Sequence, residues 1–277
     1  MKTSRKKIDF YQVVCIVILV LFAILMIFPL YWILTGSVKD AAAINAAVPQ
    51  WFPQNPTLSN YVRLFQKPAM LWLWNTVFSS VMAMVLTCIT ATMAGYVLAK
   101  KRFVGRHVIF TLMVCAMALP KQVILVPLLK EMAFLGWHDT LWAIILPVVG
   151  WPFGVFLMKQ FSEGIPTEML EAARIDGAGE GLTFVKIVVP MVKPGVGALA
   201  IFTFISAWND YFMQLIMLNS NKNLTISLGI AKLQAELSTD FGLTMAGAAL
   251  AAIPIIVVFL AFQKYFTQGI TMGAVKG

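Results

Sequence analysis

Trp208, Asn209 and Asp210 form a cluster about midway along an apolar run of the sequence. A carboxylate in such a setting needs a partner or water, because its exposure to lipid is costly. The Asn209 amide can both donate hydrogen bonds to hydroxyl groups and accept them. The cluster therefore predicts the lining of a solute path, and the alternative is a structural hydrogen bond or ion pair to another span or to a partner chain.

Lys121 is a second ionisable residue inside an apolar run, between Pro120 and Gln122. A helical rise of about 1.5 Å per residue places it about 20 Å from the start of that run. A lysine at this depth can extend its ammonium group to the membrane interface. If Lys121 instead faces the solute path, it would favour an anionic solute such as a uronate oligosaccharide or a sugar phosphate.

A polar segment, residues 171–190, carries the most informative pattern of the chain. Its residues predict a helix from Pro166 to Asp176, a turn over residues 177–179, a second helix from Gly181 to Val189, and a stop at Pro190. The small side chains of Ala172 and Ala173 permit close approach of a partner. Such a surface is suited to docking rather than to catalysis.

Enzymatic motifs are missing from the sequence. No GxxxxGK[ST] phosphate loop, GxSxG elbow or HExxH helix occurs, so we expect neither catalytic residues nor a bound cofactor in this chain. The cysteines and the two histidines lie too far apart in sequence to predict a metal site.

Composition indicates a membrane protein. The chain has 277 residues, of which 60% are hydrophobic and only 12% are charged, more apolar surface than one soluble core can bury. The net charge of +9 comes from basic residues beside apolar runs, without the aromatic pattern of a nucleic-acid-binding sheet. We therefore expect contact with membrane lipid and none with nucleic acid.

The expected fold is an all-α polytopic membrane protein with one transmembrane domain, residues 1–277. A bilayer-crossing helix needs about 20 mostly apolar residues. Six segments meet this requirement, approximately residues 10–34, 74–99, 108–129, 141–158, 196–218 and 243–262. Prolines in the third and fourth segments predict bent helices around a cavity.

Charge predicts the orientation of these spans. With both termini in the cytoplasm, inside segments carry fourteen Lys and Arg residues and outside loops carry six, as the positive-inside rule requires. The polar segment then lies within a loop of about residues 160–193 that faces the cytoplasm.

The polar segment resembles the "EAA" signature of ABC importer permeases. The matching positions are Glu171, Ala172, Ala173, Gly177, Ile187 and Pro190, with Val189 in place of the usual Leu. Further stretches resemble the carbohydrate-type (maltose-type) branch of that family, including Asn75-Thr76, FVGR at 103–106, Leu135-Gly136, Asp139-Thr140, IPTEMLEAARIDGA at 165–178 and Trp208-Asn209.

The resemblance implies a type I ABC importer of the bacterial or archaeal cytoplasmic membrane. The first helix of the loop would be a coupling helix, and Glu171, Ala172, Ala173, Asp176, Gly177, Ile187 and Pro190 would transmit force from an ATPase. Implied partners are a second homologous permease, a dimer of ATPase subunits that binds ATP and Mg²⁺, and an extracytoplasmic solute-binding protein.

The implied solute is a sugar or oligosaccharide. Acidic saccharides, polyols and glycerol phosphates stay open, because importers of other solutes share the EAA loop. An ion-coupled secondary transporter would account for intramembrane Lys121 and Asp210, but the sequence has no evident internal repeat. A membrane scaffold or receptor is the remaining alternative.

Overall fold

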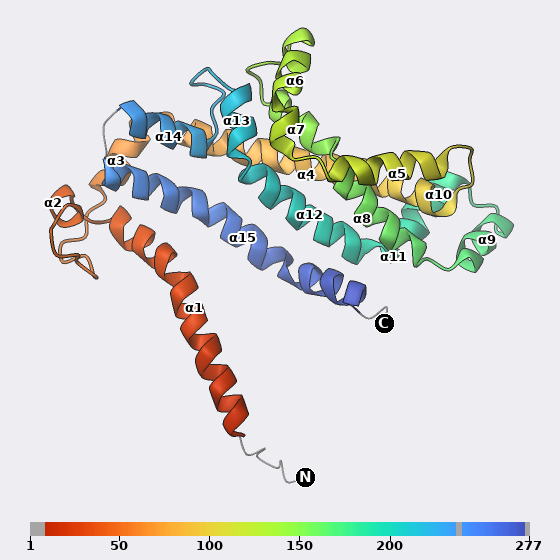
Figure 1. Ribbon diagram of the computed structural model, residues 1–277, viewed down its shortest axis with the longest axis horizontal. Coiled ribbons are helices and arrows are strands. Elements are labelled where there is room, and N and C mark those ends of the chain that lie inside the picture. Colours follow the sequence, from red (N-terminus) through yellow and green to blue (C-terminus); the bar gives the residue numbers. More distant parts are fainter. Residues whose placement is uncertain (1–8, 237–239, 275–277) are drawn as a thin grey trace. The chain divides into compact units, whose positions relative to one another are not determined.

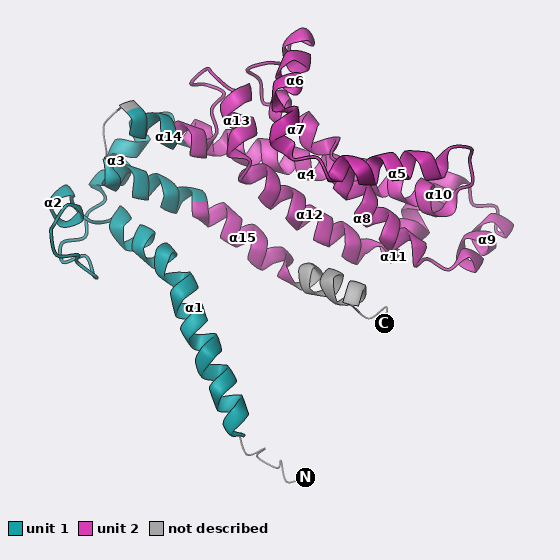
Figure 2. Ribbon diagram, in the orientation of Figure 1, with its two compact units in different colours: residues 1–69, 230–251 teal, residues 70–229, 252–277 magenta. Residues whose placement is uncertain are grey.

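The computed structural model describes residues 9–236 and 240–274, and within these residues every regular element is helical (Figure 1). The N-terminal residues 1–8 and the last three residues, which belong to the termini expected in the cytoplasm, lie outside the described residues. The chain divides into two compact units (Figure 2). Unit 1 comprises residues 1–69 and 230–251, and unit 2 comprises residues 70–229 and 252–277.

Unit 2 contains most of the helices. They are α4 (Ala69–Lys100), α5 (Arg106–Met117), α6 (Lys121–Phe134), α7 (Trp142–Val149), α8 (Pro152–Glu163), α9 (Thr167–Ile175), α10 (Glu180–Thr183), the π-helical turn η1 (Phe184–Val188), α11 (Val189–Met191), α12 (Lys193–Trp208) and α13 (Tyr211–Met217). Within this unit α8 packs against α5 and α12, and α13 packs against α6 and α7. Two further helices, α14 (Ile226–Glu236) and α15 (Phe241–Ala274), contribute to both units.

Prolines divide two of the expected spans. The chain bends by 107° between α5 and α6, where Pro120 takes an extended conformation and disfavours helix at the residue before it. Trp151 is likewise extended between α7 and α8, and Pro152 begins α8, where its missing N–H costs no helical hydrogen bond. The predicted bends in these spans are therefore helix breaks.

Glycines allow close contact between α4 and α8. A Cβ on Gly95 would lie only 2.6 Å from the backbone nitrogen of Lys159, and a Cβ on Gly154 would lie 3.1 Å from both Ala91 and Thr87. Small residues at such crossings let helix backbones approach closely in membranes. The cluster beside this contact includes the buried residues Met158, Leu170 and Val188.

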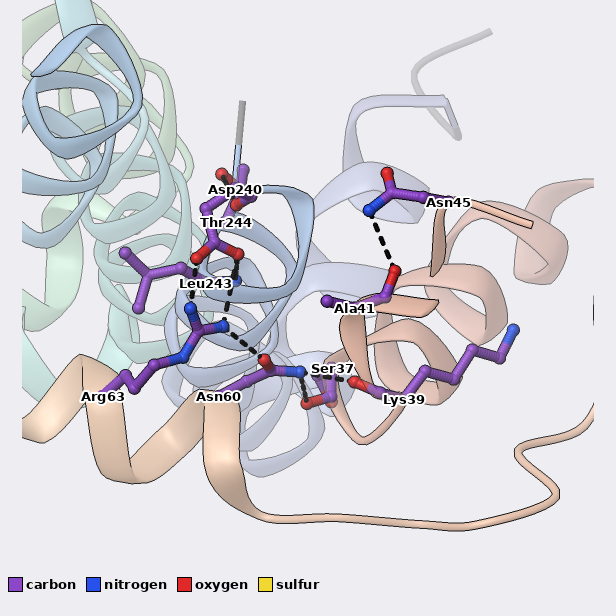
Figure 3. Close-up of polar contacts among 9 residues, drawn as sticks. All are labelled: Ser37, Lys39, Ala41, Asn45, Asn60, Arg63, Asp240, Leu243 and Thr244. Atoms are coloured by element: carbon purple, nitrogen blue, oxygen red, sulfur yellow. Dashed lines mark hydrogen bonds and ion pairs between the residues drawn. The ribbon is translucent and has the colours of Figure 1, made fainter. Parts of the chain in front are cut away.

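Unit 1 contains α1 (Phe10–Ser37), α2 (Ala41–Ile44), α3 (Ser59–Phe65) and the first part of α15. A polar network joins α1, α3 and the start of α15 (Figure 3). The Asn60 amide donates to the backbone oxygens of Ser37 and Lys39, at 3.0 and 2.8 Å. Arg63 donates to Asn60 Oδ1 at 2.8 Å and pairs with Asp240. Because these bonds satisfy backbone groups in an irregular segment, they fix the connection between α1 and α3.

Within the described residues, four helical segments are long and apolar enough to cross a membrane, namely α1, α4, residues 142–163 and residues 241–263. The number rises to six if each of two bent pairs counts as one span. The second bent pair joins residues 180–191 to α12 at an angle of 76°. The expected span 196–218 thus covers α12 and α13, which Asn209 and Asp210 separate.

Candidate functional site

Helix α9 occupies the position of the predicted coupling helix and begins and ends close to the predicted bounds. Pro166 is its extended N-cap residue, Glu168 lies in the first turn and Arg174 in the last. This placement of charges complements the helix dipole. The helix ends at Ile175 because Gly177 adopts a φ of +80°.

The turn after α9 is a Schellman motif. The Ala178 N–H donates to the Ala173 oxygen at 2.9 Å, and the Gly177 N–H donates to the Arg174 oxygen at 3.0 Å. This pair of bonds satisfies carbonyls at the helix end and requires a left-handed residue, which is usually glycine. The sequence match at Gly177 therefore has a local physical cause.

The two alanines of the signature face in different directions. Ala173 is buried at 6% exposure, whereas Glu171 and Ala172 are exposed. The exposed surface of α9 also includes Ile175, which is 86% exposed, and Met169. Ala173 thus packs into its own chain, and of the two alanines only Ala172 stays exposed for the predicted contact with a partner. Sequence inspection missed the apolar side chain of Ile175.

The segment after the turn does not stop at Pro190 as predicted. A π-helical turn over Phe184–Val188 widens the helix just before Pro190, where the proline cannot donate a backbone hydrogen bond. The helix then continues to Met191, and the chain bends at Val192. Ile187 packs against the hydrophobic cluster, whereas Pro190 is exposed.

A group of charges connects α9 and α10 to the end of α4. Glu180 pairs with Lys101, and Arg174 Nη2 lies 3.0 Å from Glu180 Oε1. The hydrogen bonds from Lys101 and then from Arg174 hold the pKa of the Glu180 carboxyl below its usual value. Lys100 donates to the oxygens of Ile165 and Glu163, at 2.6 and 3.1 Å. We call Lys101, Arg174 and Glu180 the charged clamp.

The second predicted cluster lies at the break between α12 and α13. Trp208 is buried at 1% exposure and its ring centroid lies 5.4 Å from that of Phe204. Asn209 is exposed and its amide donates to the Ile205 oxygen at 2.9 Å. Asp210 is the N-cap of α13, where its carboxylate accepts from the Met213 N–H at 3.3 Å.

Lys121 and Asp210 lie together, although they are far apart in sequence. Lys121 Nζ is 3.9 Å from Asp210 Oδ2, 3.5 Å from Ser206 Oγ and 5.1 Å from the centroid of the Trp151 ring. Both charged residues occur at helix breaks, since Lys121 begins α6 and Asp210 precedes α13. The intramembrane charges that the sequence singled out therefore form one ion pair.

A cavity of about 140 Å³ adjoins this pair within unit 2. The cavity is lined by Lys121 together with residues that carry aromatic rings or hydroxyl groups, among them Thr87, Trp151, Phe153, Phe202 and Ser206. Trp208 and Asn209 are not among the lining residues. Sequence inspection missed Phe153 and Phe202, whereas Trp151 lies near a span end, where a tryptophan also suits the membrane interface.

Asp139 is a further residue that sequence inspection noted only within the resemblance. It has a φ of +58°, and its carboxylate accepts from the Asn219 and Ser220 N–H groups at 2.8 and 3.0 Å. Burial alone would raise the pKa of Asp139, but hydrogen bonds from Ser220, Asn219 and Asn223 outweigh it and lower the pKa to about 2.

The loop that Asp139 contacts, residues 218–225, is also fixed from the start of α4. Trp72 Nε1 donates to the Asn221 oxygen at 2.8 Å, and the Asn75 amide donates to the oxygens of Lys222 and Leu224 at 2.8 and 2.9 Å. The loop is therefore pinned at several backbone positions.

The described part of the chain contains no group of three or more His, Cys, Asp or Glu residues that could hold a metal ion. The two predicted clusters thus lie at an exposed face of α9 and beside a cavity.

Comparison with known proteins agrees with this architecture. Residues 91–272 match the family described as the binding-protein-dependent transport system inner membrane component. The chain is 33% identical over 259 residues to the arabinooligosaccharides transport system permease protein AraQ of Halalkalibacterium halodurans, covering 92% of this chain and 93% of the relative. It is 34% identical over 263 residues to the maltodextrin transport system permease protein MdxG of Bacillus subtilis, covering 94% of each.

The fold is similar to that of a solved bacterial ABC transporter chain involved in the import of the acidic polysaccharide alginate. The TM-score is 0.84 at 24% sequence identity, covering 96% of this chain and 100% of that chain. At this identity the similarity establishes the fold.

These findings define a helical, multi-pass permease of the inner membrane. The chain belongs to the family of binding-protein-dependent transport system inner membrane components. The resemblance to carbohydrate-type ABC importer permeases is thereby confirmed, and the chain is a transport subunit rather than the ATPase.

Proposed function

We propose that this chain is one of two permease subunits of an ATP-driven importer for a sugar or oligosaccharide, and that α9 is its coupling helix. ATP and Mg²⁺ bind to a pair of partner ATPase subunits, and an extracytoplasmic solute-binding protein delivers the saccharide. The proposed solute class follows the relatives whose names specify arabinooligosaccharides, lactose and maltodextrin.

The observation that carries the proposal is the exposed surface of α9 on a helix that is fixed at both ends. Glu171 and Ala172 face outward together with Ile175. The bond from Lys100 to the Ile165 oxygen before α9 and the charged clamp after it tie the helix to the end of α4. Force applied to this surface would therefore reach α4 directly. Within the proposal, the conformation of this segment is maintained by Asp176, Gly177, Ile187 and Pro190.

The geometry of α4 supports a cytoplasmic coupling segment and an extracytoplasmic loop 218–225. Asn75 contacts that loop near the start of α4, and Lys101 contacts Glu180 just beyond its end. A continuous helix over these residues spans about 38 Å, more than the roughly 30 Å hydrocarbon core of a bilayer. With the excess of basic residues on the side of the clamp, both chain termini lie in the cytoplasm.

The cavity beside Lys121 forms part of the solute path in this proposal. Lys121 lines it directly, and Asp210 and Asn209 lie at the adjoining break between α12 and α13. Trp208 is buried against Phe204, so its role is to support the wall of the path.

Co-purification of the native complex, followed by a screen of saccharides for stimulation of ATP hydrolysis, tests the proposal. We expect a second permease and an ATPase pair in the complex, and stimulation by a saccharide together with its binding protein.

Loss of ATPase co-purification in Ile175→Asp, but not in Val104→Asp, would assign the docking to α9. Val104 is a matched control, because it is fully exposed in the turn between α4 and α5. A purified complex without an ATPase, or uptake driven by an ion gradient alone, would contradict the proposal.

A further inference from the structure

The cavity beside α6 has an uneven distribution of charge. Among the described residues that line it, Lys121 alone carries a charge, and Asp210, which does not line it, lies 3.9 Å from the lysine ammonium group. The lysine side chain is 38% exposed, while that of Asp210 is 20% exposed. The cavity is therefore lined by a lysine whose ammonium group has a less exposed carboxylate beside it.

The contacts of Lys121 leave donor capacity for a solute. An ammonium group has three N–H donors, and the polar contacts at Ser206 and Asp210 measure 3.5 and 3.9 Å, longer than the usual hydrogen-bond distance. The Trp151 ring faces the same ammonium group. Lys121 is thus held in place by weak contacts.

Thr87 supplies a second, independent sign of a polar ligand. It lines the cavity, is 3% exposed, and within the described residues its buried Oγ1 has no hydrogen-bond partner. Buried hydroxyl groups are paired in most native structures. A solute hydroxyl would provide the partner for Thr87, just as it would for Lys121.

The aromatic lining suits the apolar faces of a sugar ring. Phe153 and Phe202 form a tilted ring pair with centroids 4.4 Å apart, and Trp151 lies close to them in the lining. Ligand sites combine such apolar surfaces with a few polar groups that fix orientation.

We propose that this cavity binds one ring of an uncharged saccharide, and that Asp210 sets this selectivity by neutralising Lys121. The inference rests on the proposed sugar-import function and adds the charge class of the solute. An anionic group that approached Lys121 would also approach the Asp210 carboxylate and meet repulsion of like charge. A neutral hydroxyl meets no such repulsion and can still accept from the ammonium group.

The size of the cavity indicates that this chain supplies only part of the binding site. About 140 Å³ is less than half of the roughly 300 Å³ at which ligand pockets begin. The second permease of the proposed complex would supply the remaining wall.

The test measures equilibrium binding of saccharides to the detergent-purified transporter. The binding protein is left out, so that its own selectivity does not affect the dissociation constants. The probes are arabinotriose, lactose and maltotriose, each compared with the same sugar oxidised to a uronate at its primary hydroxyl groups. The variants are Asp210→Asn, Lys121→Met, the double variant and the control Glu131→Gln, which removes an exposed carboxylate from the same helix as Lys121. Asparagine also caps helices well, so Asp210→Asn keeps the N-cap of α13.

In the wild type we expect at least one neutral probe to bind more tightly than its uronate. Asp210→Asn should shift the ratio of the two dissociation constants at least tenfold toward the uronate, and addition of Lys121→Met should abolish this shift. Glu131→Gln should leave the ratio unchanged. A wild-type preference for the uronate, or an unchanged ratio in Asp210→Asn, would overturn the inference. The proposed function would still stand in that case, because the transporter would bind a sugar. If no probe bound the wild type, the proposed function would fail together with this inference.

Discussion

Gly177 shows how one residue of the signature acts through its backbone. Its φ of +80° closes the turn after α9, and a Cβ at this position would meet no atom within 4 Å. A Cβ here therefore costs conformational energy without a clash against the described residues. The penalty for a left-handed residue other than glycine is about 1–2 kcal/mol, and it is smaller for asparagine.

We expect Gly177→Ala to weaken coupling more than Gly177→Asn, because alanine opposes the left-handed turn and asparagine tolerates it. The measurement is saccharide taken up per ATP hydrolysed in proteoliposomes that contain the whole transporter. Gly179→Ala is the matched control, since Gly179 has a negative φ and open space around it. Gly177→Trp should be the most damaging change, and its additional effect over alanine would measure contact with the ATPase. Normal coupling in both Gly177→Ala and Gly177→Trp would remove Gly177 from the coupling turn.

Among the elements, the loop 218–225 is held by bonds to its backbone from two other segments. Asp139 holds it from the loop between α6 and α7, and Trp72 and Asn75 hold it from α4. Exposed side chains such as Asn219 and Lys222 are thereby presented on a fixed backbone.

We expect Asp139→Ala to destabilise the chain by about 2–3 kcal/mol, because two backbone N–H groups lose their acceptor and alanine opposes the left-handed conformation. Asp139→Asn should cost less, because asparagine retains one oxygen acceptor and tolerates that conformation. Thermal unfolding of the purified chain measures both effects. Equal stability of the alanine variant and the wild type would show that Asp139 does not fix the loop.

The effect of Asp139 should depend on pH in a defined direction. Its folded pKa of about 2 lies below the ordinary value of 3.8. The ionised carboxylate therefore stabilises the fold fully above pH 3.8, and this contribution is lost as the pH falls through about 2. The difference in Tm between the wild type and Asp139→Asn should shrink over this interval.

Local patterns in the sequence predicted the helices better than the contacts between them. Helix α9 and its glycine turn follow from residues within a dozen positions of each other, and the break at Pro120 follows from one proline. The inward face of Ala173 and the pairing of Lys121 with Asp210 depend on how distant helices pack. The depth of Lys121 along an apolar run could not reveal that its partner lies 89 residues later, at another helix break.

For the whole molecule, the proposed topology places the coupling segment and the loop 218–225 on opposite sides of the membrane. In a background with Cys15, Cys88 and Cys115 replaced by alanine, we expect Lys222→Cys to react with a membrane-impermeant maleimide in intact cells. Gly179→Cys should react only after the membrane is permeabilised, although Gly179 is exposed as well. Labelling of Gly179→Cys from outside would invert the topology and exclude the proposed contact with an ATPase.

Because α4 is continuous, it fixes the rotation about its axis between the contacts at its start and the contacts at its end. Its early residues Trp72 and Asn75 face the loop 218–225, and Lys101 after its last turn faces Glu180. Each residue added to a helix turns all that follow by about 100°. A single insertion in the middle of α4 would therefore misalign one set of partners even though it lengthened the helix by only about 1.5 Å. A homologous permease that keeps both sets of contacts therefore has to keep the number of residues between them.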